Sequence, residues 1–112
     1  MSHYLIELYS PKPAWLALNQ SARQAFFDGI GAGMGQLSAL GIEANALGKT
    51  DASVLKAASQ TFFALWRAPD ATAIATLVNA IEASGWHDYF DTVNAVGEGV
   101  DLAGHLQQLA PL

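Results

Sequence analysis

Branched and aromatic residues alternate along four short segments of the chain, and this period of two is typical of β-strands. The first and third segments each carry a single charged residue, Glu7 and Arg67, so both of their faces are largely apolar and need to be covered. The second segment is less apolar, which favours a place at the edge of a sheet. The predicted strands are residues 3–9, 42–47, 60–67 and 90–96.

Three other stretches have the apolar spacing of helices. The longest is predicted from the N-cap Ser21 to about Leu40, with Gly41 as its left-handed C-cap. Its apolar residues recur at steps of four, seven and three along one stripe, which is expected to face the core. The stripe consists of Phe26, Ile30, Leu37 and Leu40.

The other two predicted helices each begin after an aspartate, whose carboxylate accepts hydrogen bonds from free backbone N–H groups. Asp70 caps a helix that runs to Ser84 and ends at Gly85, and Asp101 caps a short helix over residues 102–109. The leucines of the short helix are expected to dock on the body of the protein.

Four glycines interrupt the longest helix, and each costs about 1 kcal/mol relative to alanine in an exposed helix. The run GIGAGMG lacks the third glycine of a phosphate-binding loop and lies in mid-helix, so we do not interpret it as a nucleotide site. Glycines one turn apart, such as Gly29 and Gly33, are instead expected to let the helix lie close to a sheet or a partner helix.

The order strand, helix, strand, strand, helix, strand is that of ferredoxin-like folds. We therefore predict an α+β protein with a βαββαβ order, an antiparallel four-stranded sheet and a short C-terminal helix, as one domain over residues 1–112. Two helices cover one face of such a sheet. Since both faces of two strands are apolar, we predict a homodimer in which the uncovered faces pack sheet to sheet.

Composition excludes several classes of function. The chain is 52% hydrophobic and 13% charged, against about 25% charged in an ordinary soluble domain. A net charge of −5 without a cluster of basic residues argues against a nucleic-acid partner. The apolar runs are too short to span a membrane, the N-terminus does not read as a signal peptide, and cysteine is absent, so a cytoplasmic protein is expected.

The chain resembles the dimeric α+β barrel superfamily in the order of its elements over nearly its whole length. The segment from Phe62 to Trp66, followed by an aspartate-capped helix and an aromatic corner, looks like the second half of such a subunit. The corner GWHDYF is similar to a motif of an uncharacterised bacterial branch. The resemblance implies proteins like the small cofactor-independent monooxygenases, haem-degrading enzymes, muconolactone-isomerase-like and EthD-like proteins.

Candidate ligand-binding residues lie on the strands. If Tyr4, Ile6 and Leu8 face the helices, the opposite face is apolar with a few polar groups, as small-molecule pockets are. This face would present Glu7, Tyr9, Glu43, Asn45, Leu47, Phe63, Leu65, Arg67, Thr92, Asn94 and Val96. Alternatively, Glu7 and Arg67 pair with each other in the dimer interface.

The corner after the second long helix holds the candidate catalytic residues. His87 has an ordinary pKa suited to proton transfer, and Asp88 or Asp91 could orient it. Its alternative is a surface histidine. Tyr89 could donate a proton, while Trp86 is a candidate ligand contact; their alternative is packing at one end of the sheet.

Cofactors and metals are not predicted. The resemblance to haem-degrading enzymes implies an asparagine on the first strand, a tryptophan in the second helix and a histidine about ten residues later. Of these His87 matches, but the first strand offers Glu7, and Leu77 stands in the helix. His87, Asp88 and Asp91 could supply one face of a metal site, although neighbouring residues point in different directions.

Two functions remain open. One is a monooxygenase- or isomerase-like enzyme that acts on a small apolar or aromatic molecule, with His87 as acid or base and Glu7, Arg67 and Asn94 positioning a polar substituent. The other is a non-catalytic dimeric barrel that binds a ligand or serves as a structural module. The fold resemblance alone does not decide between them.

Overall fold

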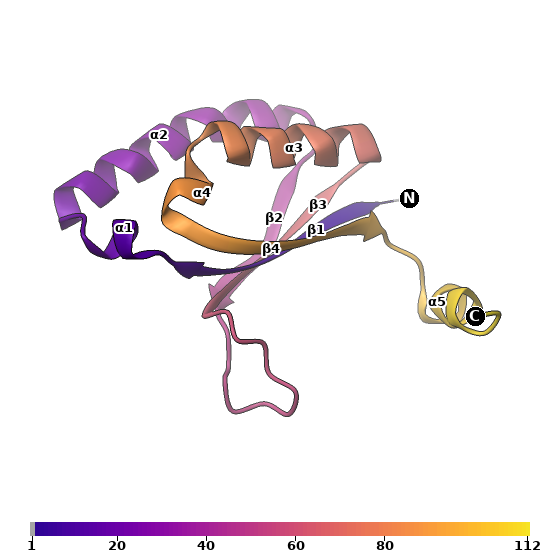
Figure 1. Cartoon of the computed structure of the whole chain (residues 1–112). Coiled ribbons are helices and arrows are strands. Elements are labelled where there is room, and N and C mark those ends of the chain that lie inside the picture. Colours follow the sequence, from indigo (N-terminus) through magenta and orange to yellow (C-terminus); the bar gives the residue numbers. More distant parts are fainter. Residues whose placement is uncertain (1) are drawn as a thin grey trace.

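The computed structural model describes residues 2–112, and within this range it contains a four-stranded sheet and five helices (Figure 1). The sheet and its two long helices have the ferredoxin-like α+β arrangement, which confirms the predicted fold class. The elements are β1 (His3–Pro11), α1 (Pro13–Leu16), α2 (Gln20–Ala39), β2 (Glu43–Lys49), β3 (Phe62–Ala68), α3 (Ala71–Ala83), α4 (Trp86–Tyr89), β4 (Phe90–Glu98) and α5 (Leu102–Leu109).

The strands lie in the order β2-β3-β1-β4, and every neighbouring pair is antiparallel. The weakly apolar β2 is at an edge, as its composition indicates, and the apolar β1 and β3 are central. Both α2 and α3 lie over the same face of this sheet (Figure 1). We call the face under these helices the helix side and the opposite face the outer face.

The helix side carries the odd-numbered residues of β1, so the expectation that Tyr4, Ile6 and Leu8 face the helices is wrong. Leu5 is fully buried in the core against α3, whereas Ile6 is 46% exposed. The reason is that α3 packs on the face of the sheet that carries Leu5. Residues opposite each other in an antiparallel pair share a face, and the core of the helix side consists of Leu5, Ile42, Ala68, Ala73, Ile74 and Leu77.

Register divides the predicted ligand-binding face between the two sides of the sheet. Tyr9 lies opposite Phe62, and Glu7 lies opposite both Ala64 and Asn94, so these residues are on the helix side. Phe63, Leu65 and Arg67 pair instead with Leu8, Ile6 and Tyr4 on the outer face. A bulge in β2 between Ala44 and Ala46 also breaks the strict alternation that the sequence suggested there.

The helix ends follow the predicted capping with one correction. The side chains of Asp70 and Asp101 accept hydrogen bonds from backbone N–H groups at 2.8 and 2.7 Å, as expected of N-caps. Gly41 and Gly85 both have positive φ angles, which suits glycine at a helix end. The longest helix, however, is capped by Asn19 rather than by Ser21, so it begins two residues earlier than predicted.

The C-terminal helix forms where it was predicted but does not dock on the body. In Figure 1, α5 stands apart from the sheet beyond the end of β4. Its leucines remain largely exposed, and Leu102 is the most exposed of them at 74%. The loop between β2 and β3 also projects away from the helices, and Leu55 in this loop is 86% exposed.

Within residues 2–112 the structure contains no helix that is both long and apolar enough to cross a membrane.

Candidate functional site

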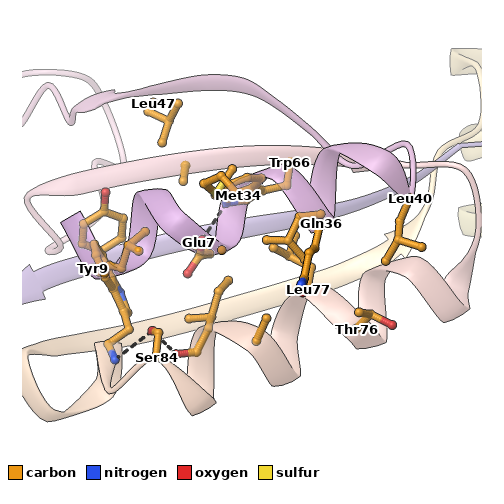
Figure 2. Close-up of a pocket in the computed structure, with 18 residues that line it drawn as sticks. Glu7, Tyr9, Met34, Gln36, Leu40, Leu47, Trp66, Thr76, Leu77 and Ser84 are labelled. Atoms are coloured by element: carbon orange, nitrogen blue, oxygen red, sulfur yellow. Dashed lines mark hydrogen bonds between the residues drawn. The ribbon is translucent and has the colours of Figure 1, made fainter. Parts of the chain in front are cut away.

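A cavity of about 320 Å³ lies between α2, α3 and the helix side of the sheet (Figure 2). We call it the helix–sheet cavity. Its walls are mostly apolar, and Ile30, Leu37, Leu77 and Ile81 are among the side chains that form them. Glu7 and Tyr9 of β1 enter it from the sheet, and Trp66 and Trp86 also line it. This volume is at the lower end of the range of small-molecule pockets, roughly 300–1,000 Å³.

Small residues create this space. Ala64 on β3 is the cross-strand neighbour of Glu7, and its methyl group leaves room above the strand. On the opposite wall, Gly29 and Gly33 of α2 line the cavity, and a Cβ added at either position would meet open space. The glycines therefore do not serve close packing against the sheet, as the sequence suggested. They leave a gap between the helix and the sheet.

Glu7 is the charged group at the centre of the cavity, and its residue is only 4% exposed. The indole N–H of Trp66 donates a hydrogen bond to its Oε1 atom at 2.7 Å (Figure 2). Burial raises the pKa of the Glu7 carboxyl, because the charged form loses water. The hydrogen bond from Trp66 and the charge of His87 both lower that pKa, but their effects are smaller than that of burial.

Tyr9 lies beside Glu7 and packs within an aromatic cluster. Its ring contacts Trp86 and Phe90 edge-on, at centroid distances of 5.2 and 5.7 Å, and it stacks on Phe62 at 5.9 Å. Burial raises the pKa of the Tyr9 hydroxyl, and the negative charge of Glu7 raises it further. The phenol therefore stays protonated and can donate a hydrogen bond at neutral pH.

His87 lies at the end of the cavity, on α4, but does not line it. Its Nδ1 atom is paired with the Glu82 carboxylate of α3, and its backbone carbonyl accepts a hydrogen bond from Lys12 Nζ at 2.5 Å. The expected partners Asp88 and Asp91 do not hold the ring. Asp91 instead lies 4.0 Å from Lys12 Nζ, because β4 begins there and carries it away from α3.

The remaining corner residues contribute packing. Trp86 stacks on Phe90 with a centroid distance of 4.1 Å, and Tyr89 contacts Trp15 and Phe26 at 5.5 and 5.0 Å. Asp88 is exposed. The corner thus brings Trp86 to the cavity and places Tyr89 on the far side of the aromatic cluster, against α1 and α2.

Two predicted ligand residues do not reach the cavity. Arg67 is on the outer face, where it is 3.5 Å from the Glu43 carboxylate and donates to the Ser2 hydroxyl at 2.8 Å. It therefore does not pair with Glu7, and that alternative is wrong within the chain. Asn94 lies opposite Glu7 on the edge strand β4, but its side chain is exposed.

Trp66, Ala64 and the α2 glycines are site residues that sequence reasoning missed. A signal was present, because Ala64 and Trp66 alternate with the residues that were assigned to the ligand face. The sequence does not give the register between β1 and β3, and this register is what brings Trp66 next to Glu7.

The described residues do not match the haem pattern that the resemblance implies beyond His87. Leu77, at the position where the resemblance to haem-degrading enzymes implies a tryptophan, is fully buried in the core, and His87 does not line the cavity. Among residues 2–112, no lysine, arginine or histidine lines the cavity. The same range contains no group of three histidine, cysteine or acidic side chains placed to bind a metal.

Residues 2–112 match a family described as "Family of unknown function (DUF6616)". The chain belongs to this family. No curated protein matches the sequence. The DUF6616 chain is therefore compared below with solved structures.

Several solved structures resemble the DUF6616 chain, and three of them are compared here. The chlorite dismutase-like protein TA0507 has a TM-score of 0.68 and 18% identity, and the match covers 98% of this chain and 48% of that one. A mutant chlorite dismutase from Candidatus Nitrospira defluvii has a TM-score of 0.60 and 10% identity, with 92% and 43% covered. A hypothetical protein of Arabidopsis thaliana has a TM-score of 0.55 and 12% identity, with 89% of both chains covered.

The DUF6616 chain spans about half the length of the two chlorite dismutase-related chains. At these identities the comparisons show a shared fold. A shared fold does not by itself indicate a shared activity.

Substituting Glu7→Gln should change how stability depends on pH. The raised pKa means that folded protein holds the Glu7 proton more tightly than unfolded protein, so the wild type loses stability as pH rises through the interval between the two pKa values. Glutamine keeps an oxygen for Trp66 and does not titrate. The variant should therefore unfold at a higher temperature than the wild type near about pH 8 and gain less near about pH 4.

Thermal unfolding followed by circular dichroism at the two pH values measures this difference. The matched control is Glu98→Gln, since Glu98 is an exposed glutamate at the other end of the sheet. A Glu7→Gln variant that is less stable than the wild type at both pH values would contradict the account of Glu7.

Proposed function

We propose that this protein is an enzyme-like binder that takes a small apolar molecule into the helix–sheet cavity, with Glu7 exchanging a proton with the bound molecule. The observation that carries this proposal is the Glu7 carboxyl, nearly inaccessible to water and facing an apolar cavity. The proposal rests on this site and not on the fold, because one fold can support many activities.

The surroundings of Glu7 favour a functional role over a structural one. A buried carboxylate is unfavourable unless several donors or a cation compensate it. Here the indole of Trp66 provides a neutral donor, and the charge of His87 acts from outside the cavity wall. A core designed for stability alone would favour an apolar residue at this position, as at the neighbouring Leu5.

The raised pKa brings Glu7 towards neutral pH, where a carboxyl group can both accept and return a proton. Such a group can remove a proton from a carbon next to a carbonyl and leave an enolate. Returning the proton to another carbon completes an isomerisation. In a monooxygenase-like reaction, the enolate instead gives electrons to dioxygen. The helix–sheet cavity supports either type of reaction on a small apolar substrate.

His87 and its neighbours take supporting roles in this proposal. His87, oriented by Glu82, places a charge near Glu7 and thereby adjusts its pKa. Tyr9 and Trp86 provide an aromatic wall and, through the Tyr9 hydroxyl, a hydrogen-bond donor for the substrate. Asp88 and Tyr89 are less suited to catalysis than the sequence suggested, because one is exposed and the other packs against α1 and α2.

Filling the cavity should abolish binding, and the α2 glycines offer a matched pair of variants. Gly33 lines the helix–sheet cavity and Gly31 does not, yet a Cβ at either position meets open space. Leucine raises helix propensity equally at both. We expect Gly33→Leu to weaken binding of the neutral fluorescent probe N-phenylnaphthylamine by about tenfold or more, and Gly31→Leu to leave it within about twofold.

Fluorescence titration measures both affinities, and circular dichroism confirms that both variants fold. Equal affinity in the two variants would place the probe elsewhere and would remove the cavity as a ligand site. If the cavity binds the probe but Glu7→Gln does not change turnover of any substrate, the non-catalytic binding module is favoured.

We also propose that two copies of the chain pack through their outer faces. The chain exposes 7379 Å², whereas a compact monomer of 11.8 kDa exposes about 5,900 Å². Its radius of gyration is 15.9 Å, against about 13 Å for a compact domain of this length. Part of this extra exposed surface belongs to apolar side chains on the outer face and on α5, among them Ile6, Val93, Leu102 and Leu106.

A charge on the outer face should dissociate this dimer. Ile6→Glu places a carboxylate in the middle of the proposed interface, next to Leu65 on β3. Leu16→Glu is the control, because Leu16 is exposed on α1, away from the outer face. Size-exclusion chromatography with light scattering should report a monomer for Ile6→Glu and a dimer for Leu16→Glu. A wild-type monomer would contradict the sheet-to-sheet assembly.

A further inference from the structure

The helix–sheet cavity contains an acid and, among the described residues 2–112, no base in its lining. Glu7 is the acid, and the other polar side chains in the wall are neutral: Tyr9, Gln36, Thr76 and Ser84. An anionic ligand would meet the negative charge of Glu7 without a cation to offset it. The lining therefore selects against carboxylates and phosphates.

Aromatic rings surround the same carboxyl group. Trp66 donates its N–H to Glu7, and Tyr9 and Trp86 form the wall at one end, with ring centroids 5.2 Å apart. Figure 2 shows Tyr9 and Ser84 towards this end of the cavity, while Leu40 and Thr76 lie towards the other. The faces of tryptophan and tyrosine rings attract cations, and the attraction strengthens when water is excluded.

We propose that the helix–sheet cavity takes a lipophilic amine, a small aromatic or alkyl group that carries one protonated nitrogen. The ammonium group pairs with the Glu7 carboxylate at the Tyr9 end, and the apolar part lies between α2 and α3. This inference rests on the proposed function and deepens it, since it names the class of molecule that the cavity binds.

An ammonium group complements the charge of this lining. It provides a countercharge for a carboxylate that is buried against apolar side chains, and it carries three hydrogen-bond donors. The Glu7 carboxylate and the Tyr9 hydroxyl oxygen are acceptors in the cavity wall, whereas the Ser84 hydroxyl already donates to the Ile81 carbonyl and accepts from the Trp86 backbone N–H. The cavity volume of about 320 Å³ is at the lower end of the range for small-molecule pockets, so we expect the ligand to be small.

Glu7 also explains why a neutral amine can enter and stay. The same ion pair forms from either state of Glu7: a protonated carboxyl group gives its proton to the nitrogen of a neutral amine, and a carboxylate pairs with an amine that is already protonated. No oxidant or further reactant takes part. The pair is held in a poorly solvated site, where opposite charges attract strongly.

Three ligands of similar shape test this inference: phenethylamine, phenethyl alcohol and hydrocinnamate. They differ in carrying an ammonium, a hydroxyl or a carboxylate group on the same phenyl ring. We expect phenethylamine to displace N-phenylnaphthylamine at a concentration about tenfold or more below that of phenethyl alcohol, and hydrocinnamate to be the weakest. Glu7→Gln should bring the amine to the level of the alcohol and leave the alcohol unchanged.

The outcomes separate this inference from the proposed function. If the alcohol binds as tightly as the amine and Glu7→Gln affects neither, while Gly33→Leu weakens both, the amine preference is wrong and the cavity remains a ligand site. If displacement by all three ligands is insensitive to Gly33→Leu, the cavity itself is not the binding site and both proposals fail. Retained amine preference in Glu7→Gln would also overturn the ion pair.

Discussion

The Glu7 carboxyl is buried on the helix side of a central strand, where it faces the helix–sheet cavity. The burial of this one acidic group is the constraint on which the rest of the site depends. A charged or polar group can be buried in a protein interior when it has partners or room to receive them. Glu7 has one neutral donor, Trp66, and a cavity formed by the small residues Ala64, Gly29 and Gly33. The helices therefore cover the sheet without filling the space between them.

This arrangement explains an unusual feature of α2. A helix with four glycines in its interior loses about 1 kcal/mol at each relative to alanine, and side chains there would have met open space. All residues of this helix are at least partly exposed, whereas α3 buries Ala73, Ile74 and Leu77 on the same sheet. The firm packing of the domain is thus between α3 and the sheet, and α2 forms the other wall of the cavity.

The order of the elements, the caps at Asp70 and Asp101 and the edge position of β2 all followed from local patterns in the sequence. The side of the sheet on which Glu7 lies did not. Alternation with a period of two separates two sets of residues, but it does not indicate which set the helices cover. We expected Glu7 on the face opposite the helices. The packing of Leu5 and Ala68 against α3 instead places Glu7 on the helix side.

The same lack of register separated Glu7 from its true neighbours. Arg67 looked like a partner because of its opposite charge, yet cross-strand pairing places it with Tyr4 on the outer face. Trp66 was not among the predicted ligand residues, yet it is the residue that donates a hydrogen bond to the carboxyl group. His87 was recognised from its chemistry, but its partner Glu82 lies on the preceding helix, five positions away, and was not considered.

The most direct test is a titration of the Glu7 carboxyl by nuclear magnetic resonance, with the side-chain carboxyl carbon as the probe. We expect the pKa of Glu7 to lie above the ordinary value of a glutamate, and to rise further in His87→Ala, because the variant removes a charge that favours the ionised form. A pKa of Glu7 at or below the ordinary value of a glutamate would contradict the central claim that a poorly solvated carboxyl group faces the helix–sheet cavity.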